Sequence, residues 1–248
     1  MENYISKFES LDKVSVYDFR LGEGGIGDYL KFYMIILMKC IRNDTRLYHR
    51  RNNIEIEKYI KLKHDFLYIP SSEIPQLGNA TIEKPHHYYD NPTYDGDIHP
   101  NEVFYFDDAV KTNVGNILSP LPASYISIHL RLGDKFLETD MEHILCKEDA
   151  RCFSPERLYR FIEDNCDKNI ILFCDNNSER LKVKNKYDSI IITTSEIGHT
   201  SLSNTTNKQI LDSITDFYIL SNSQFIYEAS HSGFSRMAAR FNNTKLVS

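Results

Sequence analysis

Hydrophobic positions recur along the first half of the chain in short runs that alternate with longer segments. Apolar and β-branched residues at 14–19 predict a strand, and the large apolar residues at 29–41 predict a helix after a glycine-rich turn. Residues 46–48 and 54–62 predict a second strand and helix, and residues 103–106 predict a further strand. This alternation is typical of an α/β fold with parallel strands.

The alternation is more regular in the second half. Short apolar runs predict strands at 125–130, 170–173, 190–192 and 225–227. Helical spacing, and a start signal of Ser154 followed by Pro155, predict helices from 155 onward, at 178–186, at 207–221 and at 235–241. Each predicted strand is thus followed by a predicted helix, as in a parallel sheet.

Two stretches interrupt the pattern. Residues 69–100 are rich in Pro, His, Tyr and Asp and predict long irregular loops, in which the run at 86–89 is either an aromatic platform for a sugar or a buried loop. Residues 119–122, Ser-Pro-Leu-Pro, predict a hinge. We therefore expect two α/β domains, 1–118 and 119–248.

Composition narrows the function classes. The 248 residues are 41% hydrophobic and 26% charged, with a net charge of −6, which argues against nucleic-acid binding because that needs a basic surface. No run approaches the roughly 20 apolar residues of a membrane span, and no secretion signal is visible. Five scattered cysteines without C-x-x-C pairs predict reduced thiols, so we expect a cytoplasmic protein.

The segment H-L-R-L-G-D at 129–134 follows the first predicted strand of the second domain. Ligands of parallel sheets bind beyond the carboxyl ends of the strands, where Arg131 can present its fork of donors to a phosphate. An ordinary surface pair of Arg131 with Asp134 is the alternative interpretation.

A polar turn at 228–239 joins the last predicted strand to the last predicted helix. Hydroxyls and backbone N–H groups at a helix start favour an anion, and this turn supplies Ser230, Ser232 and Ser235. Simple N-capping by Ser232 or Ser235 is the alternative.

The turn G-G-I-G-D at 24–28 precedes the first long predicted helix. Its spacing does not match the dinucleotide fingerprint G-x-G-x-x-G, so alone it predicts only a tight turn. Gly25 and Gly27 gain weight from the order of the glycine turn, the H-x-R-x-G-D segment and the serine-rich turn.

These three segments, in this order, resemble the α1,2-fucosyltransferase and protein O-fucosyltransferase superfamily. Residues 24–33 are similar to its early G-G-x-G-N-Q motif, 129–134 to its H-x-R-R-G-D motif, and 230–239 to its S-N-S-S-F-S-W-W-A-A motif. Residues 216–221 resemble the D-L-x-L-M-S block that precedes the last motif.

The resemblance implies a GT-B fold, in which two Rossmann-like domains face a cleft, with a reduced N-terminal domain because the chain is short for the group. It implies an inverting glycosyltransferase that needs no metal or other cofactor. The donor would be GDP-fucose, and the acceptor would be a hydroxyl of a glycan or glycolipid.

The resemblance also implies roles for individual residues. Arg131 would bind the β-phosphate and stabilise charge on the leaving nucleotide, and His129 would support Arg131. Ser232, Phe234 and Ser235 would hold phosphates and ribose, and Asp175 would face the base or ribose. The implied donor-binding residues are Gly25, Gly27, His129, Asp134, Asp175, Ser230, Ser232, Gly233, Phe234 and Ser235.

Departures from the family pattern leave the donor open. Leu132 replaces the second arginine of the H-x-R-R-G-D motif, and Arg236 and Met237 replace the tryptophan pair of the last motif. Asp28 stands where the family has asparagine, and the turn around it also resembles the G-x-G-D-x-L turn of heptosyltransferases, in which the aspartate is a candidate base. Capping of the following helix is the other interpretation of Asp28.

Two further classes remain as alternatives. A metal-dependent GT-A enzyme needs a D-x-D motif at a strand end, for which only Asp95 with Asp97, or Asp107 with Asp108, are available. A non-catalytic glycan-binding relative of a transferase is the second alternative, although retained Arg131 and Ser232 argue against it.

Overall fold

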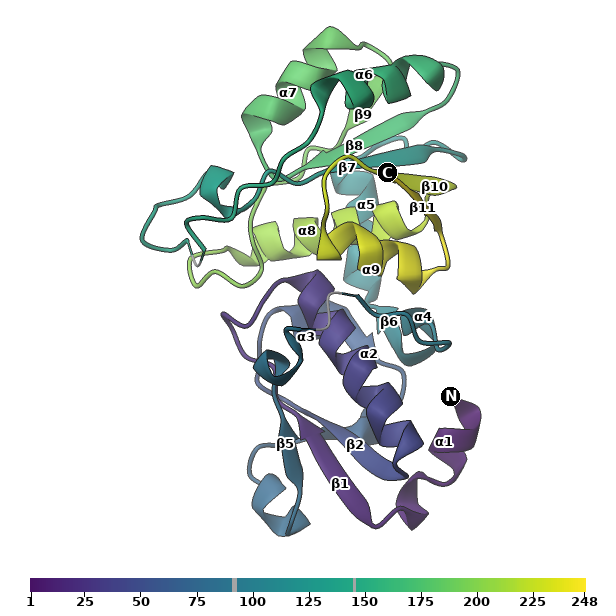
Figure 1. The fold of residues 1–248 in the computed structure, drawn as a ribbon, viewed down its shortest axis with the longest axis vertical. Coiled ribbons are helices and arrows are strands. Elements are labelled where there is room, and N and C mark those ends of the chain that lie inside the picture. The colour runs from purple at the N-terminus through teal and green to yellow at the C-terminus, as the bar shows by residue number, and fades with distance from the viewer. Residues whose placement is uncertain (91–92, 145) are drawn as a thin grey trace.

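Two parallel sheets are stacked along the long axis of the molecule in a computed structural model that describes residues 1–90, 93–144 and 146–248 (Figure 1). The N-terminal sheet has the order β4-β2-β1-β5. Its strands are β1 (Lys13–Tyr17), β2 (Thr45–Arg50), β4 (Tyr68–Ile69) and β5 (Thr81–Glu83). The parallel α/β architecture that the sequence predicts is confirmed.

The C-terminal sheet has the order β11-β10-β7-β8-β9, with all strands parallel. Its strands are β7 (Ile126–Leu130), β8 (Ile170–Cys174), β9 (Ile190–Ile192), β10 (Phe225–Glu228) and β11 (Lys245–Val247). Strand β7 is central and buried over its whole length. Because the strands are parallel, the residues that follow β7, β8 and β10 meet at one edge of the sheet.

Helices form a middle layer between the two sheets and an outer layer on the second sheet (Figure 1). The middle layer contains α2 (Ile26–Arg42), α5 (Asp108–Ile117), α8 (Asn207–Ser221) and α9 (Gly233–Phe241). The outer layer contains α6 (Pro155–Asp164) and α7 (Asn177–Lys186). Helix α2 packs against α9 and α5 packs against α8, so the middle layer joins the two sheets.

The buried side chains follow these layers. One continuous cluster reaches from Tyr4 to Phe241 and includes apolar residues of α2, α5, α8 and α9. A smaller cluster lies between the second sheet and its outer helices, around Leu158 and Val183. The long cluster holds α2 firmly against α9, and this contact sets the position of the cavity described below.

Several predicted elements are wrong or incomplete. The helix predicted at 54–62 is a short α3 (Ile56–Tyr59) followed by β3 (Ile60–Leu62), which pairs antiparallel with β6 (Phe104–Phe106). A strand partner distant in sequence therefore overrides the local helical spacing. The sequence does not predict β4, β5, β11 or α5, and it places β5 within an irregular loop. The remaining helices are α1 (Glu2–Ser6) and α4 (Pro100–Val103).

The boundary between domains 1–118 and 119–248 stays a prediction. Helix α5 precedes this boundary in the sequence yet packs against α8, beside the second sheet (Figure 1). Within the described residues, no helix is both long enough and apolar enough to cross a membrane.

Candidate active site

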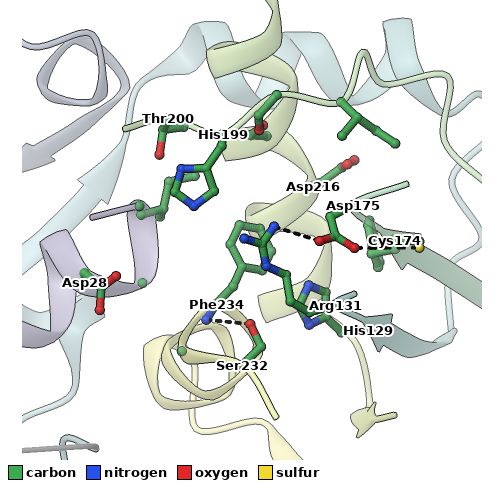
Figure 2. A pocket seen from close by; sticks show the side chains of 18 of the residues that line it. Asp28, His129, Arg131, Cys174, Asp175, His199, Thr200, Asp216, Ser232 and Phe234 are labelled. Carbon is green, nitrogen blue, oxygen red and sulfur yellow. Dashed lines mark hydrogen bonds and ion pairs between the residues drawn. The ribbon is translucent and has the colours of Figure 1, made fainter. Parts of the chain in front are cut away.

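A cavity of about 290 Å³ lies between the start of α2 and the carboxyl ends of β7 and β8 (Figure 2). It brings together residues from all three motifs that the sequence singles out. The predicted site residues that line it are Gly25, Gly27, Asp28, His129, Arg131, Asp175, Ser232, Gly233 and Phe234. The structure therefore gathers most of the predicted site into one space.

Arg131 is held by carboxylates from three segments. Its guanidinium pairs with Asp175 at 2.8 Å, with Asp134, and at 3.9 Å with Asp149. The side chain of Arg131 is only 11% exposed. Such buried pairs fix the guanidinium in place, and removal of one partner would leave the others uncompensated.

Asp175 does not project freely into the cavity. Its carboxylate accepts hydrogen bonds from the backbone N–H groups of Leu132 at 2.8 Å and Gly133 at 3.1 Å, in addition to the pair with Arg131. It thereby fastens the turn after β7 to the end of β8. These contacts favour a role in holding Arg131, and the predicted contact of Asp175 with a base or ribose stays untested.

Asp134 and Ser230 are placed behind the cavity wall. Asp134 contacts Arg131, and burial raises the pKa of Asp134 above its usual value; the charge of Arg131 opposes this rise and the neighbouring Asp149 adds to it. The Ser230 hydroxyl donates to the carbonyl of Arg131 at 2.7 Å and accepts from its N–H at 2.8 Å. Both residues position Arg131 from behind.

His129 supports the wall through its ring. It is buried and stacks on Phe234 with ring centroids 5.1 Å apart. Burial, together with the positive charges of Arg131 and Arg151, lowers the pKa of His129 to about 3. The ring is therefore neutral near pH 7, in agreement with the supporting role that the sequence analysis assigns to it.

The first turn of α9 lies beside Arg131, and together they form one side of the cavity, the C-terminal wall. Ser232 caps the helix by accepting from the Phe234 N–H at 3.2 Å. Beneath it the buried Glu228 carboxylate accepts from the Ser232 N–H at 2.9 Å and from the Ser235 hydroxyl at 2.8 Å. Ser235 is buried and donates to Glu228 below the helix. Of the first turn of α9, Ser232, Gly233 and Phe234 line the cavity.

The first turn of α2 forms the opposite side of the cavity, the N-terminal wall. The helix begins at Ile26 after the N-cap Gly25, with no side-chain cap. Asp28 therefore lies within the first turn, and the interpretation of Asp28 as the capping residue is wrong. Its carboxylate is 39% exposed and pairs with Lys31 at 3.1 Å.

Glycine is required where the two walls touch. A Cβ atom on Gly27 would lie 2.7 Å from the backbone carbonyl of Gly233, closer than real Cβ atoms approach. A side chain at Gly24 would collide with Asp28 at 2.6 Å. The glycine turn thus allows the starts of α2 and α9 to meet beside the cavity, and both helix N-termini favour negative charge there.

The sequence interpretation missed several residues that line the cavity. The polar ones are Lys31, Arg151, Glu196, His199, Thr200, Ser213, Asp216 and His231, and the others are apolar or small neighbours. Arg151 pairs with Asp149 at 3.1 Å and donates to the His231 carbonyl at 2.6 Å. Most of the missed residues come from loops without periodicity, although Asp216 begins a block that the family resemblance already marks.

Asp216 is unusual among the acidic residues of the site. Its carboxylate accepts from the Ser195 hydroxyl at 2.7 Å, and desolvation by burial raises its pKa to about 7 despite that hydrogen bond. It lies near Asp175 and on the far side of the cavity from Asp28 (Figure 2). A carboxylate in this setting gains from a ligand that donates hydrogen bonds to it.

The candidate metal ligands lie elsewhere. Among the described residues, a cluster of Asp140, Glu142 and His143 could hold a cation, but none of the three lines the cavity. The D-x-D candidate at Asp107 is used structurally, since Asp107 caps α5 and pairs with Lys61 at 2.6 Å. The residues of the aromatic run at 86–89 have different surroundings. The Tyr88 hydroxyl donates to Glu83, whereas Tyr89 is exposed and packs one side of its ring on Phe32.

Comparison with known proteins identifies the class of fold. No family model and no curated protein matches the chain. The crystal structure of NodZ α-1,6-fucosyltransferase soaked with GDP-fucose matches with a TM-score of 0.55 at 11% identity, over 92% of each chain. NodZ is from Bradyrhizobium.

Two other solved structures give the same result. A mutant of FUT1 from Arabidopsis thaliana in complex with GDP matches with a TM-score of 0.59 at 10% identity, over 99% of this chain and 74% of FUT1. POFUT1 in complex with GDP matches with a TM-score of 0.51 at 9% identity, over 94% of this chain and 95% of POFUT1. The chain thus has the GT-B fold of the fucosyltransferases, as the resemblance of its motifs predicts.

Proposed function

We propose that this protein is an inverting glycosyltransferase that transfers a sugar, with fucose as the first candidate, from a GDP-linked donor to a glycan hydroxyl. The observation that carries the proposal is the cavity in which Arg131 and the start of α9 face Asp28 on α2. The structures with the same fold contain GDP or GDP-fucose, which supports this choice of donor.

The donor diphosphate is assigned to the C-terminal wall. The backbone N–H groups at the start of α9, the Ser232 hydroxyl and the guanidinium groups of Arg131 and Arg151 converge there. These side chains would supply the charge compensation that a divalent ion supplies in metal-dependent transferases, so we propose that no metal is needed.

The base of the nucleotide is assigned to the end of the cavity that contains Asp216. Guanine carries adjacent N–H donors on its Watson–Crick edge, whereas adenine and uracil do not present the same pair. An ionised carboxylate accepts such a pair well, and Asp216 presents a carboxylate to this end of the cavity, where its Oδ1 accepts from the Ser195 hydroxyl. This contact would select GDP.

The transfer step uses the opposite wall. The acceptor hydroxyl oxygen attacks the anomeric carbon while the bond from that carbon to the β-phosphate oxygen breaks, and the electron pair leaves with GDP. Asp28 takes the proton of the hydroxyl as general base. Lys31, at 3.1 Å from Asp28, holds that carboxylate at the start of α2.

Release of GDP from GDP-fucose tests the proposal without knowledge of the acceptor. The purified protein, in buffer with a metal chelator, is expected to release GDP slowly by transfer of the sugar to water. The Asp28→Asn variant is the matched control and should release GDP more slowly while binding it equally well. Absence of both GDP binding and GDP release would contradict the proposal and would favour a non-catalytic protein.

A further inference from the structure

The His199 side chain lies between the two walls of the cavity, in a segment that the proposed reaction leaves without a role. It belongs to the connection between β9 and α8, and it faces the space between Asp28 and Arg131 (Figure 2). Arg131 and Asp28 are both among the charged groups that act on its pKa. A ring at this place can contact a ligand held by either wall.

Hydrogen bonds to the ring determine where its proton is. The backbone N–H of Ser201 points to Nδ1 at 3.4 Å, and the Ser201 hydroxyl lies 2.5 Å from the same nitrogen. A backbone N–H can only donate, so Nδ1 is an acceptor and the neutral ring carries its proton on Nε2. Burial and the charge of Arg131 lower the pKa of His199 to about 3, which keeps the ring neutral near pH 7.

The segment that carries His199 is held at several points. The Thr205 hydroxyl donates to the His199 carbonyl at 2.6 Å, and the Gln209 side chain donates to the Ile197 carbonyl at 2.9 Å. The Ser213 hydroxyl donates to the Gly198 carbonyl at 3.0 Å. The ring is therefore fixed before any ligand binds.

The Nε2 edge of the ring faces the start of α2. A Cβ atom on Gly25 would lie 3.4 Å from Cε1 and 3.5 Å from Nε2 of His199. Gly25 is the N-cap of a helix without a side-chain cap, so this edge lies beside a helix terminus that favours negative charge. The donor on Nε2 and the positive end of the helix favour the same kind of ligand atom.

The charges around Arg131 and Arg151 show why a diphosphate needs another hydrogen-bond donor. Arg131 and Arg151 are surrounded by Asp134, Asp149 and Asp175, so two guanidinium groups face three carboxylates. A diphosphate at this wall needs more hydrogen-bond donors than the guanidinium groups alone leave free. His199 supplies one without a further carboxylate partner.

We propose that His199 donates its Nε2 hydrogen to the β-phosphate of the bound nucleoside diphosphate, from the side opposite Arg131. This assignment rests on the proposed function, because that function places the diphosphate against Arg131 and the start of α9. When the sugar leaves, negative charge develops on the β-phosphate oxygen, and a donor fixed in advance stabilises that charge. Ser201 is then a positioning residue that keeps the proton on Nε2.

Calorimetric titration with GDP and GMP tests the assignment, since GMP lacks the β-phosphate. The His199→Phe variant keeps a ring but has no donor, and we expect it to bind GDP about 10-fold more weakly while GMP binding is unchanged. The His199→Gln variant offers an amide N–H at a similar reach and should recover most of the loss. The Ser201→Ala variant should show a smaller loss for GDP alone.

The outcomes separate the two proposals. Wild-type protein that binds neither GDP nor GDP-fucose overturns the proposed function and this assignment with it. Wild-type binding of GDP that His199→Phe leaves unchanged, or a loss that is equal for GDP and GMP, overturns only the role of His199. Thermal unfolding of each variant shows whether it is folded, and His199→Leu, which also lacks a donor, decides the question should His199→Phe fail to fold.

Discussion

The two walls of the cavity differ in how firmly their polar side chains are held. On the C-terminal wall, Arg131 contacts carboxylates from three segments, and Glu228 receives hydrogen bonds from Ser232 and Ser235. On the N-terminal wall, Asp28 is 39% exposed and has one ion pair, with Lys31. A rigid wall suits the binding of a diphosphate, because its donors are held in place in advance. A general base must be reached by the acceptor hydroxyl, and the partly exposed Asp28 carboxylate can be reached in this way.

Replacement of Arg131 should give the largest effect because it disrupts the rigid wall itself. The Arg131→Ala variant leaves Asp134 and Asp175 buried without their counter-charge, and loss of one partner of a buried ion pair typically costs about 3–5 kcal/mol. We expect a large decrease in the free energy of unfolding, measured by urea denaturation, and loss of GDP binding.

Arg131→Lys is the matched control for that experiment. It keeps a positive charge but not the fork that contacts two carboxylates, so it should recover stability better than GDP binding. An Arg131→Ala variant with wild-type stability would show that the carboxylates are not held by this residue.

The sequence could predict the rigid wall better than the opposite one. Strand β7 and the turn after it are local in sequence, so Arg131, His129 and Ser232 could be assigned from motifs alone. The sequence predicts Asp28 just before a helix that begins at Tyr29, whereas α2 begins three residues earlier, at Ile26, so that Asp28 lies inside its first turn.

The residues that the sequence could not predict depend on long-range contacts. Strand β5 is three residues long and is defined only by its pairing with β1, and β3 by its pairing with β6. His199 and Arg151 reach the cavity from irregular connections whose course depends on many hydrogen bonds. No local pattern in the sequence indicates that they meet Arg131.

Replacement of Asp28, on the N-terminal wall, distinguishes a role in catalysis from a role in donor binding. Asp28→Asn keeps the shape of the side chain but cannot accept a proton as a base. If Asp28 is the base, the rate of GDP release from GDP-fucose should fall by about 10²–10⁴ while the calorimetric affinity for GDP hardly changes. An unchanged rate of GDP release would show that Asp28 is not the base. A change in GDP affinity would instead assign Asp28 to donor binding.

The contact between the walls gives a smaller effect that is purely steric. In Gly27→Ala the new methyl group meets the backbone of Gly233 at 2.7 Å, and overpacking of this kind costs about 1–3 kcal/mol. In Gly233→Ala the methyl group meets nothing within 4 Å. Thermal unfolding should therefore show a clear loss for Gly27→Ala and little change for Gly233→Ala, and equal losses would argue against this close approach.

The smallest predicted effect is a pH dependence of nucleotide affinity. Burial raises the pKa of Asp216 to about 7, and only the ionised carboxylate accepts hydrogen bonds from guanine on both oxygens. Protonation thus competes with GDP at low pH, so the affinity should rise by about tenfold between roughly pH 6 and pH 8. In Asp216→Asn the calorimetric affinity should be lower at high pH and should change little with pH.

The choice among nucleoside diphosphates is the property that the proposed donor site must show. Isothermal titration calorimetry of the wild-type protein with GDP, UDP and ADP, each in the presence of a metal chelator, compares the three on the same site. We expect GDP to bind at least about tenfold more tightly than UDP or ADP without metal. Tighter binding of UDP or ADP, or binding of GDP only after manganese is added, would contradict it.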